Sequence, residues 1–145
     1  MAKTINSEIE INASAEKIWK ILTGFEAYPE WNPFIISLQG PVATNQKITV
    51  KIKPVNGQVM TFKPIVLVYE PHKEFRWLGH LLFKGLFDGE HSFRIIELNP
   101  NKCNFIQSET FKGILVPLFR TMLEINTYEG FQLMNSRLKE LAENN

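Results

Sequence analysis

The stretch GLFDGEHSF, residues 85–93, gathers the side chains of this sequence that are best able to do chemistry. Asp88, Glu90 and His91 lie close together in the chain, as the ligands of a metal ion or the groups of an acid–base cluster would. The stretch alternates as a strand does, however, so neighbouring side chains point to opposite faces. His91 then faces away from the two carboxylates. We therefore expect a strand that begins with a turn or bulge at Asp88-Gly89, and no metal centre.

His91 has a candidate partner in the segment FIQSETF, residues 105–111. One face of this predicted strand carries Phe105, Gln107, Glu109 and Phe111. His91 lies opposite Glu109 if three residues connect the two strands, and opposite Thr110 if two residues do. Inside a cavity, His91 and Glu109 would hold or polarise a ligand carbonyl group, or act as a catalytic acid–base pair. The alternative is a structural pair, either buried or exposed on the convex face.

Other side chains with reactive groups lack the context that their chemistry needs. Ser92 has no G-x-S-x-G elbow, which argues against a serine hydrolase. Cys103 begins a strand without a neighbouring cation or histidine, so we expect it to be a small apolar filler. A single cysteine excludes an internal disulfide and a cysteine-based zinc site. The sequence has no Gly-rich phosphate loop and no H-E-x-x-H motif, and we expect no cofactor.

Length and composition indicate the general class of protein. A chain of 145 residues predicts one domain, 1–145, and 44% hydrophobic with 21% charged residues is typical of soluble globular proteins. The net charge of +1 gives no indication of nucleic acid or an anionic membrane as a partner. The N-terminus lacks the apolar segment of a signal peptide, and the longest apolar runs are too short to span a bilayer. We expect a cytoplasmic monomer or homodimer without membrane insertion.

Hydrophobic periodicity predicts the elements that position these side chains. Residues 4–12 alternate as a half-buried strand, and Ser14 is a good N-cap for the helix that follows. The segment FEAYPEWNPF predicts a short helical turn. Asn56-Gly57 predicts a hairpin between strands 46–53 and 58–69, with Pro64 at an edge or bulge. The sequence also predicts three further strands joined by short turns, as in an antiparallel sheet, at 75–83, 86–98 and 103–112.

Residues 116–143 have helical periodicity, which predicts a helix roughly 40 Å long. Its apolar stripe consists of Phe119, Leu123, Thr127, Gly130, Met134, Leu138 and Leu141. Thr127 and Gly130 are small residues at the middle of this stripe. They either leave an apolar cavity beneath the helix or are covered by large sheet side chains such as Trp77, Phe93 and Phe105.

These elements and several motifs resemble the SRPBCC superfamily, in particular its polyketide cyclase/dehydrase-like branch. The motifs span essentially the whole chain: INASAEKIWKIL, YPEWNPF, GLFDGEHSF, FIQSETFKGIL and YEGFQLMNSRLKELAE. The superfamily shares the helix-grip fold of START lipid-transfer domains and birch-pollen-allergen-like proteins. The resemblance implies an α+β fold. In it, a curved antiparallel sheet of six to seven strands wraps around a long C-terminal helix, and two short helices follow the first strand.

The resemblance leaves three functions open, because one fold can host several. The first hypothesis is binding of a small hydrophobic molecule, such as a lipid or polyketide, in a cavity between the sheet and the C-terminal helix. The second is an enzyme of the cyclase/dehydratase type that uses His91 and Glu109; we favour binding over catalysis. The third is a protein-interaction module linked to stress response or chaperones, which predicts a filled core and an exposed apolar patch.

The binding hypothesis specifies the residues expected at the ligand. These are Trp31, Phe34, Phe62, Trp77, His91, Phe93, Glu109, Phe111, Leu118, Met122, Thr127 and Phe131. His91 and Glu109 would orient the ligand, and the other residues would form the wall. Trp31 and Phe34 lie in a Trp-Asn-Pro-Phe turn that would form an entrance or wall at one end of the cavity. The alternative is that they seal the core beneath the first helix.

Overall fold

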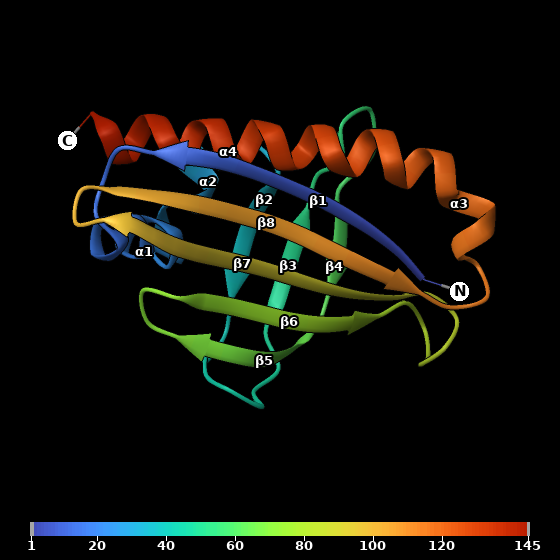
Figure 1. Ribbon diagram of the computed structural model, residues 1–145. Coiled ribbons are helices and arrows are strands. Elements are labelled where there is room, and N and C mark those ends of the chain that lie inside the picture. The colour runs from blue at the N-terminus through green and yellow to red at the C-terminus, as the bar shows by residue number, and fades with distance from the viewer. Residues whose placement is uncertain (1, 145) are drawn as a thin grey trace.

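The computed structural model describes residues 2–144, which form two antiparallel sheets and a long C-terminal helix (Figure 1). The larger sheet has five strands in the order β1-β8-β7-β6-β5, and the smaller has three in the order β2-β3-β4. In Figure 1 the smaller sheet crosses behind the larger one at a steep angle. The strands are β1 (Ala2–Ile11), β2 (Ile35–Gln39), β3 (Thr49–Ile52), β4 (Met60–Phe62), β5 (Ile65–Glu70), β6 (Glu74–His80), β7 (Asp88–Asn99) and β8 (Lys102–Lys112).

The described chain has eight strands where the sequence predicted six or seven, because the expected strand 58–69 is two strands and because β2 was not among the predicted strands. Pro64 separates β4 from β5, since a proline has no N–H to donate to a ladder. The chain passes there from the small sheet to the large one. Two backbone hydrogen bonds hold the crossing: Ile48 N donates to the Pro64 carbonyl at 3.0 Å, and Val66 N donates to the Gln46 carbonyl at 2.9 Å.

Two short helices follow β1, as expected: α1 (Ala15–Leu22) and α2 (Tyr28–Trp31), with the 3₁₀ turn η1 (Phe25–Ala27) between them. Ser14 caps α1, because its Oγ accepts a hydrogen bond from Lys17 N at 3.2 Å. Asn32 Oδ1 accepts from the backbone N–H groups of Phe34 at 3.0 Å and Ile35 at 2.8 Å. This amide therefore shapes the turn that leads into β2.

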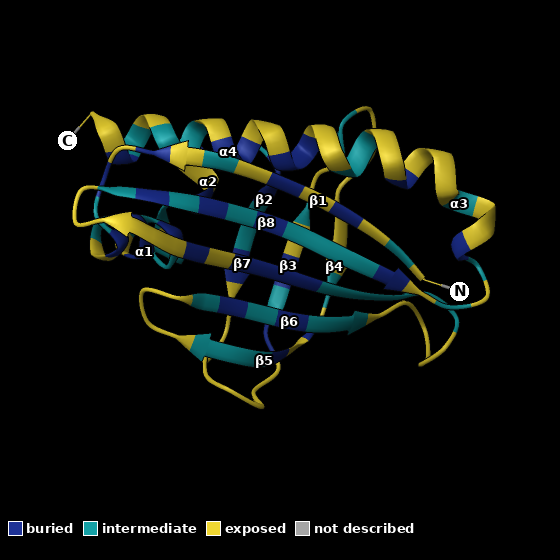
Figure 2. Ribbon diagram, in the orientation of Figure 1, coloured by how far each residue is buried: buried dark blue, intermediate teal, exposed yellow. Residues whose placement is uncertain are grey.

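The C-terminal helix has three parts: α3 (Val116–Met122), the π-helical turn η2 (Leu123–Thr127) and α4 (Tyr128–Glu143). Figure 1 shows it running along the β1 and β8 side of the large sheet. In Figure 2 the buried residues of this helix lie where it meets the sheet, and most of its outer side is exposed. Within residues 2–144, no helix combines the length and the apolar character that a membrane span requires.

The small residues at the middle of this helix are covered by one aromatic ring, that of Phe34. A Cβ atom on Gly130 would overlap the Phe34 ring, so only glycine lets the ring approach so closely. Phe34 also meets Phe131 edge-on, with ring centroids 5.6 Å apart. The space beside Gly130 is thus neither an empty cavity nor filled by the sheet side chains that we considered. Phe34, from the turn before β2, fills it.

Candidate ligand-binding site

The cluster of Asp88, Glu90 and His91 does not converge in space. Asp88 accepts hydrogen bonds from Gly85 N at 3.1 Å, and its Oδ1 lies 2.8 Å from His80 Nδ1. Glu90 forms an ion pair with Arg76 at 2.7 Å. His91 is completely buried on the inner face of β7. The alternation of a strand thus separates the imidazole from both carboxylates, and within residues 2–144 no three metal-ligating side chains cluster.

Asp88 and Gly89 do not form the turn or bulge that we expected. Both residues are part of β7, where Gly89 pairs with Gly79 of β6 and with Phe111 of β8. The chain turns in the preceding segment, 81–87, which we call the β6–β7 loop. The prediction was wrong because the Asp-Gly pair resembles a turn locally. The structure uses Asp88 instead to accept hydrogen bonds that close the loop, and it uses Gly89 to leave space inside the sheet.

His91 lies directly opposite Glu109 in the β7–β8 ladder. The strands are joined by a two-residue turn, Pro100-Asn101, which by itself would have shifted the pairing by one residue. A bulge between Glu97 and Asn99 inserts one extra residue into β7 and restores it. The pairing expected from a three-residue connection therefore forms by a different route.

A chain of hydrogen bonds runs from His91 through the core to the first strand. His91 Nε2 lies 2.9 Å from Gln107 Oε1, and Gln107 Nε2 donates to Asn135 Oδ1 at 2.7 Å. Asn135 Nδ2 donates to Ser7 Oγ at 2.9 Å, and Ser7 Oγ donates to the Gln107 carbonyl at 2.8 Å. All four side chains are buried. The chain therefore links β7, β8, α4 and β1 through polar groups that have left water.

This chain determines which nitrogen of His91 carries a hydrogen. The Ser7 hydroxyl donates to a carbonyl, so it accepts from the Asn135 amide nitrogen, and the Asn135 oxygen accepts from Gln107. Gln107 Oε1 is then the acceptor for His91, so Nε2 is the protonated nitrogen. His91 Nδ1 faces Glu109 Oε1 at 3.4 Å and forms no hydrogen bond within the described chain.

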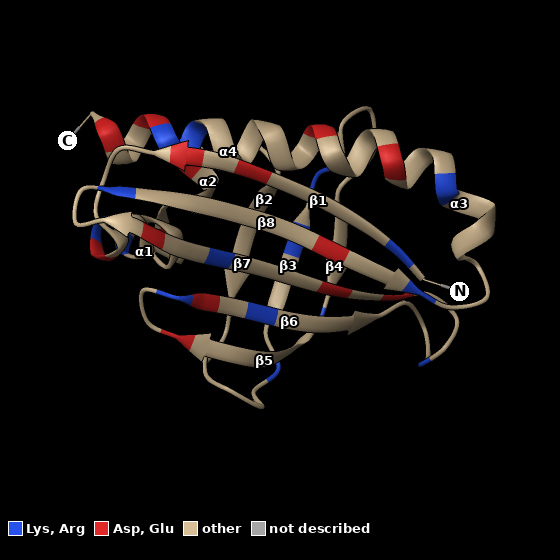
Figure 3. Cartoon of the chain, in the orientation of Figure 1, with Lys and Arg blue, Asp and Glu red and all other residues tan. Residues whose placement is uncertain are grey.

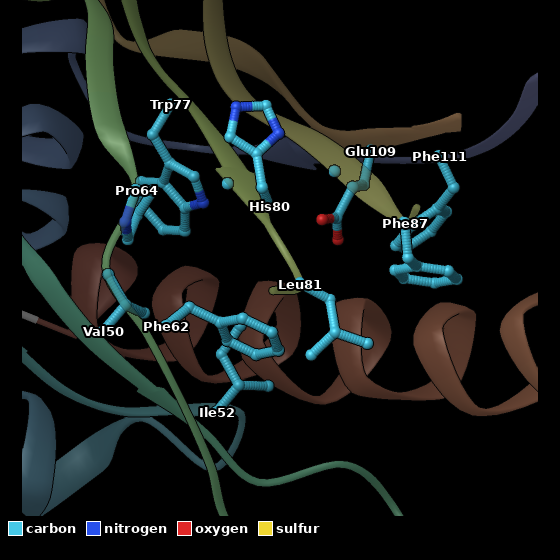
Figure 4. A pocket seen from close by; sticks show the side chains of 12 residues that line it. Val50, Ile52, Phe62, Pro64, Trp77, His80, Leu81, Phe87, Glu109 and Phe111 are labelled. Carbon is cyan, nitrogen blue, oxygen red and sulfur yellow. The ribbon is translucent and has the colours of Figure 1, made fainter. Parts of the chain in front are cut away.

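A pocket of about 50 Å³ lies between the two sheets beside Glu109 (Figure 4). Val50, Ile52 and Phe62 of the small sheet face Trp77, Phe87 and Phe111 across it. In Figure 4 the Glu109 carboxyl group points into the middle of this apolar ring. No residue of the C-terminal helix lines the pocket. The cavity expected between sheet and helix is therefore replaced by a pocket between two sheets, because Phe34 already fills the space under the helix.

Two glycines that are neighbours in the large sheet leave room for this pocket. Gly79 of β6 and Gly89 of β7 are directly paired, and both line it. A Cβ atom on Gly89 would lie 2.5 Å from Glu109 Oε2, so the carboxyl group occupies space that a side chain at position 89 would take. The absence of two inward side chains thus makes room both for the pocket and for the carboxyl group within it.

Four of the expected ligand-binding residues line the pocket, namely Phe62, Trp77, Glu109 and Phe111. His91, Phe93 and Phe131 are completely buried deeper in the core. Trp31 meets Tyr28 edge-on at 5.4 Å between ring centroids and is buried, so it seals the core beneath α1.

The expected residues on the C-terminal helix do not reach the pocket. Thr127 is half-buried, while Leu118 and Met122 are exposed. Val116 and Leu123 take the inward positions of this helix. At 100° per residue, positions 118 and 122 then point well away from the core, which is why the prediction for these two residues was wrong.

Several residues of the site were missed by sequence reasoning. Asn135 was not singled out, Gly89 was considered only as part of a turn, and the polar role of Ser7 and Gln107 was not recognised. A signal was present, because polar side chains at inward positions of β1, β8 and α4 have to find one another when these elements pack together.

A larger hollow of about 740 Å³ lies at the other end of the large sheet, between the start of α1 and the β5–β6 turn. It is an open groove whose wall includes Glu16, Glu70, Lys73 and Arg94. Because charged groups line it and solvent fills it, it does not offer the apolar enclosure that a hydrophobic ligand requires.

Solved structures with the same fold include enzymes and a START protein. The aromatase/cyclase Zhui from Streptomyces sp. R1128 superposes with a TM-score of 0.78 at 13% identity, covering 99% of this chain and 94% of that one. A START superfamily protein from Mycobacterium smegmatis gives a TM-score of 0.71 at 22% identity, covering 95% and 98%. The di-domain ARO/CYC protein BexL of the BE-7585A biosynthetic pathway gives 0.79 at 14% identity and covers 99% of this chain. The match spans 51% of BexL, so this chain has about half its length.

No curated protein matches the sequence. Residues 2–143 match the family described as "Polyketide cyclase / dehydrase and lipid transport". The match spans nearly the whole chain and agrees with the helix grip seen in the structure, with its long C-terminal helix and its short helices after β1. The chain therefore belongs to the polyketide cyclase/dehydrase and lipid transport family.

Proposed function

We propose that this protein binds a small hydrophobic molecule that carries a neutral hydroxyl group, in the pocket between the two sheets. The observation that carries the proposal is the Glu109 carboxyl group, which points into a ring of mostly apolar side chains that also includes His80 (Figure 4). Burial of the apolar part of the ligand supplies the affinity, at about 25 cal/mol per Å². One polar contact with Glu109 supplies the orientation.

The chemistry of the hydroxyl group follows from the contact between His91 and Glu109. A lone pair on Nδ1 and an ionised carboxylate would repel each other at 3.4 Å, and a single proton between them makes the contact favourable. The pair then has no net charge, whichever atom holds the proton. Glu109 Oε2 remains free as an acceptor beside Gly89. It therefore suits a hydroxyl donor and gives no net charge to balance an ionic ligand.

The pocket has to widen before it accepts such a molecule. Its 50 Å³ corresponds to about two water molecules, whereas small-molecule sites enclose about 300–1,000 Å³. The β6–β7 loop is the part whose outward movement would open the pocket. Leu81 and Phe87 of this loop line the pocket, while Leu82 and Phe83 between them are exposed. We infer that the loop swings outward to admit the ligand.

Binding of naphthol and of naphthalene tests this proposal, because the two probes differ by a single neutral hydroxyl group. We expect naphthol to bind at least about tenfold more tightly, as one hydrogen bond to a carboxyl group allows. Glu109→Leu removes this preference and retains binding of naphthalene. Glu109→Gln retains the preference, because its amide can donate to His91 Nδ1 and present its oxygen to the ligand. Glu90→Leu, on the outer face of β7, is the matched control, and equal affinities for both probes in the wild-type protein would refute the proposal.

Acid–base catalysis by Glu109, with His91 as its proton partner, is the second candidate. The observation that favours it is the direct 3.4 Å contact of the two groups at the edge of the pocket. The norcoclaurine synthase of Thalictrum flavum and the aromatase/cyclase Zhui show that this fold hosts enzymes, at 14% and 13% identity. Glu109→Gln separates the two functions, because it preserves hydroxyl binding and abolishes proton transfer. Turnover of a polyketide-like substrate that survives this change would exclude the catalytic role.

A further inference from the structure

Six large apolar side chains are exposed at the end of the molecule where the pocket lies. This surface, which we call the apolar end patch, comprises Leu82 (86% exposed), Phe83 (60%), Ile114 (75%), Leu118 (74%), Met122 (49%) and Ile125 (53%). Its two segments are joined by backbone hydrogen bonds: Ile114 N donates to the Gly85 carbonyl and Leu115 N to the Leu86 carbonyl, each at 3.1 Å. Figures 1 and 2 show the β6–β7 loop and α3 together at this end, both largely exposed.

The helical part of the patch is a regular stripe. Leu118, Met122 and Ile125 follow one another at intervals of four and three residues, which places them on one side of the helix. Val116 and Leu123 bury the other side against the sheets. A helix that is apolar on both sides has two surfaces to cover, and the described chain covers only one of them.

The loop part of the patch contains a residue in an unfavourable backbone conformation. Leu82 has a φ of 64°, in the left-handed region that a leucine rarely adopts. Its side chain gains nothing from the core in return, because it projects into solvent. Asp88 holds this conformation by accepting hydrogen bonds from Gly85 N at 3.1 Å. The loop therefore presents apolar side chains in a conformation that packing within the chain does not explain.

Basic residues surround the patch (Figure 3). Lys84 lies in the loop and Lys112 precedes Ile114, and both are exposed without an ion-pair partner in the described chain. Lys3 and Arg120 share Glu124, at 2.7 and 3.3 Å. Hydrogen bonds from Lys3 and then Arg120 lower the pKa of this carboxyl group, so that it stays ionised.

Two further acidic groups lie beside the patch: Asp88, which is directed at His80 and the Gly85 N–H, and the exposed Glu129, one helical turn beyond Ile125. Two unpaired lysines therefore give this end a positive charge, although the whole chain carries only +1. The overall charge gave no indication of this, because it sums the whole chain and does not show where unpaired charges lie.

We propose that the apolar end patch docks on the surface of an anionic lipid bilayer. Leu82, Phe83 and Leu118 would enter the boundary between headgroups and acyl chains, as the apolar face of an interfacial helix does. Lys84 and Lys112 would lie at the level of the anionic headgroups. The proposal extends beyond the ligand pocket and does not depend on what the pocket holds.

The charge argues against a second copy of this chain as the partner. A symmetric dimer brings the same patch of each copy together. Lys84 and Lys112 of one copy would then face those of the other, and like charges across an interface weaken association. An anionic bilayer instead complements the lysines and accommodates the apolar side chains at the same time.

Flotation with lipid vesicles tests the proposal on the intact chain. We expect binding to vesicles of phosphatidylcholine mixed with phosphatidylglycerol, weakening as salt is added, and none to pure phosphatidylcholine. The double variants Leu82→Ser/Phe83→Ser and Lys84→Glu/Lys112→Glu should each reduce binding at least about tenfold. Leu98→Ser, at an exposed leucine in the other end of β7, and Lys73→Glu, in the β5–β6 turn, are the matched controls and should bind like the wild type.

Three outcomes would overturn the proposal. One is the absence of binding to the mixed vesicles. Another is binding that both double variants retain while circular dichroism shows them to be folded. The third is a dimer in sedimentation that Leu82→Ser/Phe83→Ser dissociates, which would assign the patch to a second copy instead.

Discussion

The two halves of the space between the sheets are filled in opposite ways. At the half beneath α1 and α2, Tyr28, Phe75 and Phe93 are completely buried, and Phe75 stacks on Phe93 with ring centroids 5.9 Å apart. At the other half, Gly79 and Gly89 lie side by side in the wall of the pocket. We call these the aromatic half and the glycine half. The same strands build both, because the inward positions of β6 and β7 change from aromatic residues to glycine along their length.

The difference teaches where stability and function reside in this fold. The aromatic half buries large side chains and contributes most of the packing energy. The glycine half lacks this packing energy, because its glycines leave the space of the pocket unfilled. His91 lies at the boundary, stacked on Phe93 at 4.6 Å on one side and facing Glu109 on the other. His91 is thus held by the rigid half, and its Nδ1 is directed at the carboxyl group that borders the open half.

The largest expected effect sharpens the contrast in stability. Phe75→Ala should lower the free energy of unfolding by about 3–5 kcal/mol, because it opens a cavity among completely buried rings. Phe87→Ala should cost less than half as much, because Phe87 is partly exposed and borders an existing pocket. Urea unfolding of both variants measures the difference. Similar losses would show that the glycine half is as tightly packed as the aromatic half.

The second largest effect on stability should come from breaking the buried chain of hydrogen bonds that runs from His91 to Ser7. Asn135→Leu leaves Gln107 Nε2 without its acceptor and removes the hydrogen bond that Ser7 Oγ accepts, which should cost about 1–3 kcal/mol. The exposed Asn104, which donates to Glu8 at 3.0 Å, offers a control, and Asn104→Leu should change stability little. Nitrogen NMR of His91 should show hydrogen on Nε2 in the wild type and a changed tautomer balance in Asn135→Leu. An unaltered His91 spectrum would mean that the chain does not set the tautomer.

The two glycines should respond differently to an added methyl group. At Gly79 the nearest atom to a new Cβ is Pro64 Cβ at 3.5 Å, an ordinary contact, so Gly79→Ala should change stability by no more than about 0.5 kcal/mol. At Gly89 the new Cβ meets Glu109 Oε2 at 2.5 Å and displaces the carboxyl group. Gly89→Ala should therefore reduce the preference for naphthol over naphthalene while Gly79→Ala preserves it. Equal preferences in both variants would count against the role of the Glu109 position.

The smallest expected effect concerns Tyr28, which should change the stability of the protein only at alkaline pH. Burial, and then the nearby Tyr69, raise the pKa of Tyr28, whose hydroxyl donates to the Leu22 carbonyl. In the unfolded chain this tyrosine loses its proton near pH 10. Above that pH the unfolded state binds fewer protons than the folded state, so stability falls by up to about 1.4 kcal/mol per pH unit. Tyr28→Phe should flatten this fall in unfolding experiments, and an unchanged slope would show that other groups cause it.

Local patterns along the chain were sufficient to predict most of the elements. The alternation of β1, the N-cap at Ser14 and the periodicity of residues 116–143 all depend on neighbours in sequence, and the structure has each of them. The pairing of His91 with Glu109 was within reach for the same reason, because two adjacent strands joined by a short turn have few registers. The site was harder to predict, because its members come from five strands and a loop.

The sequence by itself determined the class of fold and most of the elements, and it gave His91 and Glu109 as a candidate pair whose register it left open. Tertiary structure alone decided what fills the space between the elements. Phe34 covers Gly130 through a contact between segments far apart in the chain, and the small sheet lies across the pocket from Gly79 and Gly89. The volume left between packed side chains depends on all the surrounding residues at once, so no local pattern of residues specifies it.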